Sequence, residues 1–80
     1  MNIIIIQITD YLNNNEFFKT IKDKERFAKL MFDTYSMRCD IMTELKKMNA
    51  WVSVNENRRK KRYDRFINSW LSRNNKYGRK

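Results

Sequence analysis

The sequence has no histidine, no proline, one glycine and one cysteine in 80 residues. Without histidine, the chain lacks the side chain most often used for general acid–base catalysis. A single cysteine excludes an internal disulfide and a zinc site built from cysteines and histidines. No glycine-rich loop is present to bind phosphates. We therefore expect no enzymatic activity, no metal ion and no other cofactor, and a cytosolic location in a host cell is the default.

Few residues remain that could carry chemistry. Asp40 and Glu44 lie one helical turn apart and could share a cation, but two such carboxylates without further ligands usually face solvent. Cys39 has no histidine to activate it. We expect Asp40 and Glu44 to be exposed helix residues and Cys39 to be a packed thiol.

The sequence also lacks a long hydrophobic run. The apolar stretch Ile3 to Ile6, with Ile8, is far shorter than a membrane span and lacks the basic flank of a signal peptide. Four isoleucines favour a strand by propensity, but no second strand-like run offers a partner. We expect a short helix, or a lone strand that pairs with another copy and so makes a homodimer. We expect no membrane partner.

The apolar content that is present indicates a core. Hydrophobic residues make up 41% of the chain and aromatic residues 14%, which is too much for a disordered tail. The polar breaks are at residues 13–15 and 49–57. The sequence predicts an all-α fold, a small three- or four-helix bundle over residues 1–75, followed by a frayed basic tail at 76–80.

Periodicity and capping residues suggest where the helices lie. Asn15 can cap a helix that begins at Glu16. A stripe with steps of three and four residues follows, which fits one long helix or two helices broken near Ser36. Its members are Phe27, Leu30, Met31, Tyr35, Met37, Ile41, Met42, Leu45 and Met48.

The last predicted helix has the clearest signals. Ser53 and Glu56 form a capping-box pattern at its start. Its apolar face predicts core residues, namely Tyr63, Phe66, Ile67, Trp70 and Leu71. Trp51 either closes this core or is exposed for base stacking.

Positive charge is concentrated in the same region. Residues 57–80 hold ten basic residues and one acidic residue, whereas residues 1–56 are neutral overall. At about 100° per residue, five cations fall on the face opposite the apolar one, namely Arg58, Lys61, Arg62, Arg65 and Arg73. Arg59 and Lys60 project past the end of the bundle, and Lys76 lies in the tail. These eight residues are the predicted nucleic-acid-binding residues, because such a helix gains affinity for phosphates by releasing counterions.

Three other interpretations compete. The basic face could be merely solvated, the run 58–62 could be a nuclear-localisation signal, or the helix could lie on a membrane surface. The membrane interpretation requires the aromatic face to be exposed, whereas so small a chain needs that face for its core.

One segment resembles a known pattern. Trp51, the basic run and the sequence Tyr63-x-Arg65-Phe66-Ile67-x-x-Trp70-Leu71-x-Arg73 are similar to the C-terminal basic segment of replication initiator and helicase-loader-type proteins of phages and mobile elements. The resemblance covers residues 51–73, and residues 1–50 carry none of it. It implies a nucleic-acid-binding accessory role rather than a complete initiator or loader.

The expected function is therefore that of a small basic accessory protein that binds the phosphate backbone of DNA or RNA with little sequence specificity. Richness in Asn, Lys and Ile is typical of AT-rich coding sequences and fits a phage or mobile-element origin. An alternative is a phage-encoded inhibitor of a nucleic-acid-guided host defence enzyme, similar to an anti-CRISPR protein. Such an inhibitor would occupy a guide RNA or the nucleic-acid channel of a host nucleoprotein.

Overall fold

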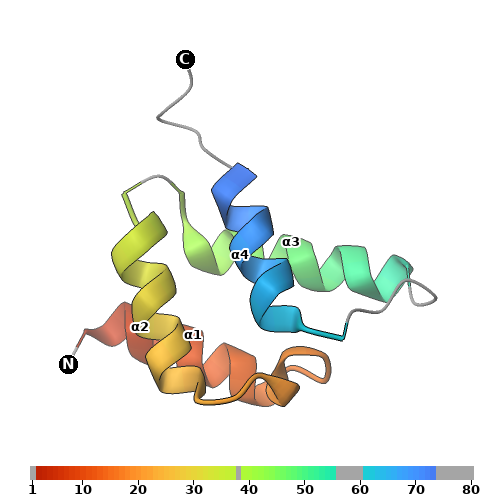
Figure 1. Cartoon of the computed structure of the whole chain (residues 1–80), viewed down its shortest axis with the longest axis horizontal. Coiled ribbons are helices and arrows are strands. Elements are labelled where there is room, and N and C mark those ends of the chain that lie inside the picture. Colours follow the sequence, from red (N-terminus) through yellow and green to blue (C-terminus); the bar gives the residue numbers. More distant parts are fainter. Residues whose placement is uncertain (1, 38, 56–60, 74–80) are drawn as a thin grey trace.

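The isoleucine-rich N-terminal segment is a helix. In the computed structural model, which describes residues 2–37, 39–55 and 61–73, the elements follow in the order α1 (Ile3–Asn14), the 3-10 helix η1 (Phe18–Thr20), α2 (Lys24–Tyr35), α3 (Ile41–Val54) and α4 (Tyr63–Arg73) (Figure 1). These described residues contain no strand. The predicted all-α fold of three or four helices is confirmed, with four α-helices in the described residues.

Helix α1 begins at a capping residue. The Asn2 side chain accepts a hydrogen bond of 2.7 Å from the backbone N–H of Ile4. A helix satisfies its own backbone groups, which a strand without a neighbour cannot do. Ile8 and Leu12 of α1 are buried, whereas Ile3 is 67% exposed. The predicted homodimer would use the exposed isoleucines of this segment, and it stays a prediction.

The chain then turns at Asn15. Its side-chain oxygen accepts hydrogen bonds from the backbone N–H groups of Phe17 and Phe18, at 2.8 and 3.1 Å. The predicted α-helix from Glu16 is wrong, because only the single turn of η1 follows. Phe17, Phe18 and Ile21 are all buried, so the chain bends to place three nearby apolar side chains in the core.

The long apolar stripe in the middle of the chain belongs to two helices. Helix α2 ends at Tyr35 and α3 begins at Ile41, so of the two predicted alternatives the structure has two helices with a break that begins at Ser36. Cys39 is buried between them with its Sγ atom 3.8 Å from the Tyr35 carbonyl, so it is the packed thiol that was predicted. Met37, in contrast, is 83% exposed and does not join the stripe.

The predicted start of the last helix is wrong. Ser53 lies in the final turn of α3, and α4 begins at Tyr63. Met48 and Val52 are fully buried and continue the apolar face of α3 past the expected break. Helix α3 ends where the backbone and side-chain N–H groups of Asn55 both donate to the Trp51 carbonyl, at 2.9 and 2.8 Å. The partner expected for Ser53, Glu56, lies outside the described residues.

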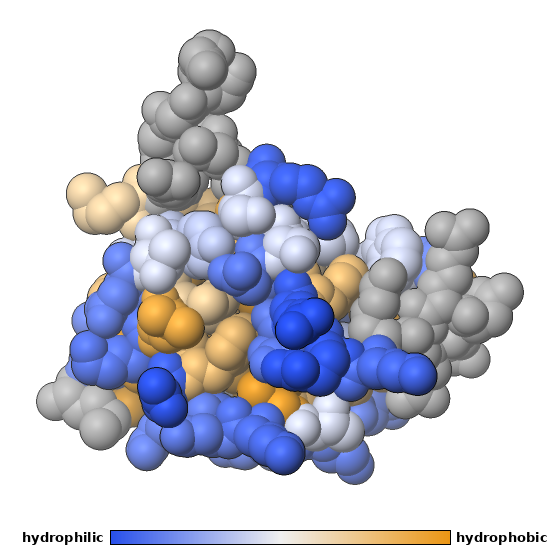
Figure 2. Space-filling view, in the orientation of Figure 1, coloured by the Kyte–Doolittle hydropathy of each residue, from blue (hydrophilic) through white to orange (hydrophobic). Residues whose placement is uncertain are grey.

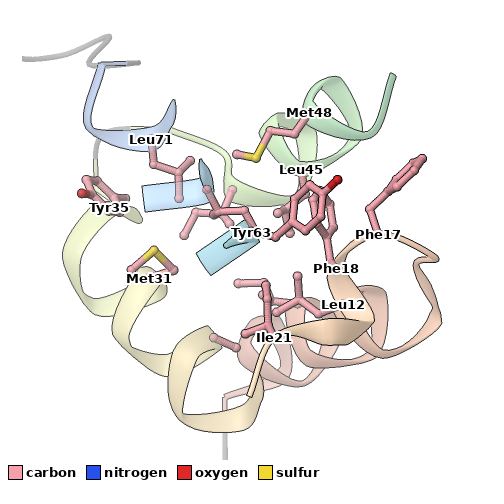
Figure 3. Packing of buried hydrophobic residues seen from close by; sticks show 14 of the residues in the cluster. Leu12, Phe17, Phe18, Ile21, Met31, Tyr35, Leu45, Met48, Tyr63 and Leu71 are labelled. Atoms are coloured by element: carbon pink, nitrogen blue, oxygen red, sulfur yellow. The ribbon is translucent and has the colours of Figure 1, made fainter. Parts of the chain in front are cut away.

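The helices meet around one hydrophobic core. Figure 3 shows side chains from α1, η1, α2, α3 and α4 converging on it. Helix α4 packs against α2, α3 and η1, while α1 packs against α2, α3 and η1. The Cα atoms extend over 33 × 32 × 17 Å, which makes the molecule a flat plate, with α4 exposing one side to solvent (Figure 1).

Among the helices described, none combines the length and the apolar character needed to cross a membrane.

Candidate nucleic-acid interface

The apolar face of α4 holds this helix on the core. Tyr63, Ile67 and Leu71 are buried. Phe66 and Trp70 are half-buried and pack against the same cluster. The five predicted core residues thus lie on the inward side of α4, which leaves the opposite side of the helix to solvent.

Aromatic rings join α4 to α3 beside this core. The Phe66 ring lies between two tryptophans, with its centroid 5.8 Å from that of Trp51 and 5.7 Å from that of Trp70. Such spacings are favourable for aromatic pairs. Trp51 is half-buried and packs on the core, so the structure places it in the first of its two predicted roles.

A buried carboxylate fixes the same junction. Glu44 is fully buried, and one of its oxygens accepts a hydrogen bond of 3.0 Å from the indole N–H of Trp70. The other oxygen lies 3.3 Å from the Lys47 ammonium group. The prediction that Glu44 faces solvent is wrong, because Trp70, distant in sequence, covers it and satisfies it. Asp40 is exposed, as predicted, and accepts a hydrogen bond from the Thr43 hydroxyl at 2.8 Å.

A second polar contact holds α4 to α2. The Tyr35 hydroxyl donates a hydrogen bond of 2.7 Å to the Asn68 side-chain oxygen. Two hydrogen bonds therefore hold α4: Trp70 donates to Glu44 of α3, and Asn68 accepts from Tyr35 of α2. Together they limit rotation of α4 about its axis. The outward face of α4 is therefore set in a defined orientation.

That outward face carries two predicted nucleic-acid-binding residues. Arg65 and Arg73 are both exposed. They are eight residues apart in one helix, which corresponds to about 12 Å along its axis. Ser69 and Ser72 lie between them and are also exposed. The Arg73 Nε–H donates to the Ser69 carbonyl at 3.3 Å, which lays this guanidinium along the helix surface.

Two further predicted residues are exposed but do not lie on the helix. Lys61 and Arg62 precede the first residue of α4, so the prediction that they share a helical face with Arg65 is wrong. The Arg62 carbonyl accepts the backbone N–H of Phe66 at 3.1 Å and so marks the start of the helix. The error follows from the misplaced helix start.

The Arg62 guanidinium pairs with an acidic neighbour. Its Nε and Nη2 groups donate to the two carboxylate oxygens of Asp64 at 3.1 and 2.8 Å. This hydrogen-bonded pair raises the pKa of Arg62 and lowers the pKa of Asp64 from their ordinary values. Within the described part of the chain, Lys61, Arg65 and Arg73 make no ion pair. They are available to an anionic ligand.

The other predicted nucleic-acid-binding residues are Arg58, Arg59, Lys60 and Lys76, which lie outside the described residues, as does the predicted frayed tail 76–80.

The fold adds a cation that the sequence did not suggest. Lys22, which follows η1, lines a hollow together with Lys61 and Arg62. In the sequence, Lys22 belongs to the neutral part of the chain and is followed directly by Asp23, so no local signal marks it. Figure 2 shows strongly hydrophilic residues gathered over the start of α4, where these segments meet. The cations therefore extend from α4 onto the neighbouring connection.

Comparisons with protein-family models, with curated proteins and with solved structures give no match to this chain. The resemblance of residues 51–73 to replication initiator and helicase-loader-type proteins thus stays a prediction.

Proposed function

We propose that this chain is a small nucleic-acid-binding accessory protein that contacts the phosphate backbone through its C-terminal third. The observation that carries the proposal is the separation of charge. Residues 57–80 hold the whole net charge of +9. The cations described in this region, Lys61, Arg62, Arg65 and Arg73, are all exposed, whereas the apolar residues of the same helix face the core.

The arrangement favours contact with the backbone over reading of bases. Arg65 and Arg73 lie on the exposed side of α4 with Ser69 between them, and serine hydroxyls and arginines are common donors to phosphate oxygens. Direct reading of bases requires side chains that reach base edges at fixed geometry. Trp51, the one candidate for base stacking, packs against Phe66 on the core. Little sequence specificity is expected.

Binding is tested by fluorescence anisotropy with labelled duplex DNA, single-stranded DNA and a structured RNA over a series of salt concentrations. Neutralising about four phosphates predicts a slope of the logarithm of affinity against the logarithm of salt near −4 for duplex DNA. Absence of binding at low salt to all three ligands contradicts the proposal. A marked preference for the structured RNA would favour the alternative, inhibition of an RNA-guided enzyme.

Charge reversal tests whether α4 is the contact surface. The double variant Arg65→Glu, Arg73→Glu changes only exposed residues and should lose nearly all affinity at moderate salt. The matched control, Arg26→Glu with Lys46→Glu, makes the same change of net charge on exposed residues of α2 and α3. Equal losses in both variants would show that total charge, and not the α4 surface, determines binding. Circular dichroism should show the same helix content in all three proteins.

A further inference from the structure

We propose that the hollow between the η1–α2 connection and the start of α4 binds a terminal phosphate of a nucleic-acid strand. This inference rests on the proposed function and names a specific site for one group of the ligand. The hollow has a volume of about 390 Å³, and its lining residues are Thr20, Ile21, Lys22, Lys61, Arg62, Tyr63 and Asp64. A hollow of this volume has room for more than one water molecule and hence for a group of the size of a phosphate.

The lining residues divide by burial. Ile21 and Tyr63 are each 5% exposed and belong to the core. Tyr63 is held there by ring contacts with Phe17 and Phe18, at centroid distances of 6.2 and 5.6 Å. Lys22, Lys61 and Arg62 are exposed. The hollow is therefore lined both by buried core side chains and by exposed cations, on two segments that the core holds together.

The charge of the hollow matches a phosphate monoester. Its lining has three cations and one carboxylate, that of Asp64, which leaves a net charge of about two positive units at neutral pH. A terminal phosphate carries about −1.5 to −2 charges, whereas each phosphate within a strand carries one. Three cations from two segments of the chain line one hollow, which suits the more highly charged and sterically freer terminal group.

The Asp64 carboxylate does not prevent Arg62 from binding a phosphate. Both of its oxygens accept hydrogen bonds from Arg62, and one also accepts the backbone N–H of Arg65 at 2.8 Å. Arg62 uses Nε and Nη2 for this pair, and a guanidinium has five N–H donors in all. Three N–H donors therefore remain for a phosphate. The Thr20 hydroxyl donates to the Phe17 carbonyl at 3.2 Å and serves to shape the turn.

The test compares single-stranded oligonucleotides that are identical except for a 5′-phosphate or a 5′-hydroxyl, with a 3′-phosphate version as a third probe. The wild-type chain should bind a phosphorylated form up to about fivefold more tightly, since exposed charge pairs contribute modestly. The variant Lys22→Gln should lose this preference. Lys19→Gln, which removes the same charge from an exposed residue outside the hollow, should keep it.

The outcomes separate this inference from the proposed function. Equal affinity of the wild-type chain for all three oligonucleotides overturns the terminal-phosphate site and leaves the proposed function intact. Loss of the preference in Lys19→Gln as well as Lys22→Gln also overturns it, because the effect would then follow total charge. If no oligonucleotide binds, an NMR titration with adenosine 5′-phosphate and with adenosine decides. Shifts confined to residues 20–22 and 61–64, and caused only by the phosphate form, support the site, and their absence overturns it.

Discussion

Helices α1 and α4 are attached to the same core and differ on the side that faces away from it. Helix α1 contains one charged residue, Asp10, and exposes Ile3 and Ile6. Helix α4 exposes Arg65 and Arg73. The core constrains only the inward face of each helix. The outward face of α1 is therefore partly apolar and that of α4 is basic, as the predicted homodimer contact at α1 and the proposed anionic ligand at α4 would each require.

The largest effect on stability is expected at Phe18, whose side chain contacts both α1 and α4. Phe18 is fully buried, and its ring contacts Tyr11 of α1 at a centroid distance of 6.4 Å and Tyr63 of α4 at 5.6 Å. Phe18→Ala should lower the free energy of unfolding by about 3–5 kcal/mol, because it leaves a cavity in the shared core. Urea denaturation followed by circular dichroism measures the loss. A cost below about 1 kcal/mol would mean that α1 and α4 do not depend on a common core.

An intermediate effect is expected from the contact that orients α4. Trp70→Phe removes the indole N–H that donates to the buried Glu44 carboxylate and keeps an aromatic ring beside Phe66. The free energy of unfolding should fall by about 1.5–3 kcal/mol, the usual range for a hydrogen bond to a charged group. Glu44→Gln keeps a hydrogen-bond acceptor and serves as the comparison. A stable Trp70→Phe protein with unchanged denaturation would show that ring packing alone positions α4.

The smallest effect on stability is expected at the Arg62–Asp64 pair, where the effect on binding should be opposite in sign. Asp64→Asn keeps an acceptor for the backbone N–H of Arg65, removes the ionic partner of the Arg62 guanidinium and raises the net charge of the hollow by one. Affinity for single-stranded DNA should rise by a few-fold, measured by anisotropy. Unchanged or weaker binding would show that the hollow does not contact the ligand.

The same pair has a defined pH dependence. The hydrogen bonds that Asp64 accepts from Arg62 lower the pKa of Asp64 in the folded chain below its ordinary value of 3.8. The pair therefore stabilises the fold at pH values above the unfolded pKa, and this contribution is lost as the pH falls through the folded pKa. In acid denaturation, Asp64→Asn should lack this part of the loss, and Arg26→Gln, which leaves the pair unchanged, should retain it.

Local sequence signals predicted the all-α fold and the inward face of α4, but not every helix boundary. The spacing of Tyr63, Ile67 and Leu71 gave the buried side of α4 because helical periodicity is a local property. The start of α4 was misplaced because the Ser53–Glu56 pattern is short and α3 keeps its apolar stripe through Val52. Burial of its apolar stripe stabilises α3 more than a short capping pattern could stabilise a new helix that begins at Ser53.

Two features of the candidate site depend on contacts between distant residues. Glu44 is buried because Trp70, 26 positions away, covers it and donates to it. Lys22 joins the basic surface because the turn at η1 packs against α4. Neither residue is distinguished by its neighbours in sequence. Only the packing of the helices reveals them.

The position of the two tryptophans gives the molecule a natural optical label. Trp51 and Trp70 are the only tryptophans in the chain, and both contact Phe66 at the junction of α3 and α4. Indole emission therefore reports on the junction of α3 and α4, whereas the far-ultraviolet circular dichroism sums over every helix. Recording both signals during a single titration separates events at α4 from events in α1 and α2, with no dye attached.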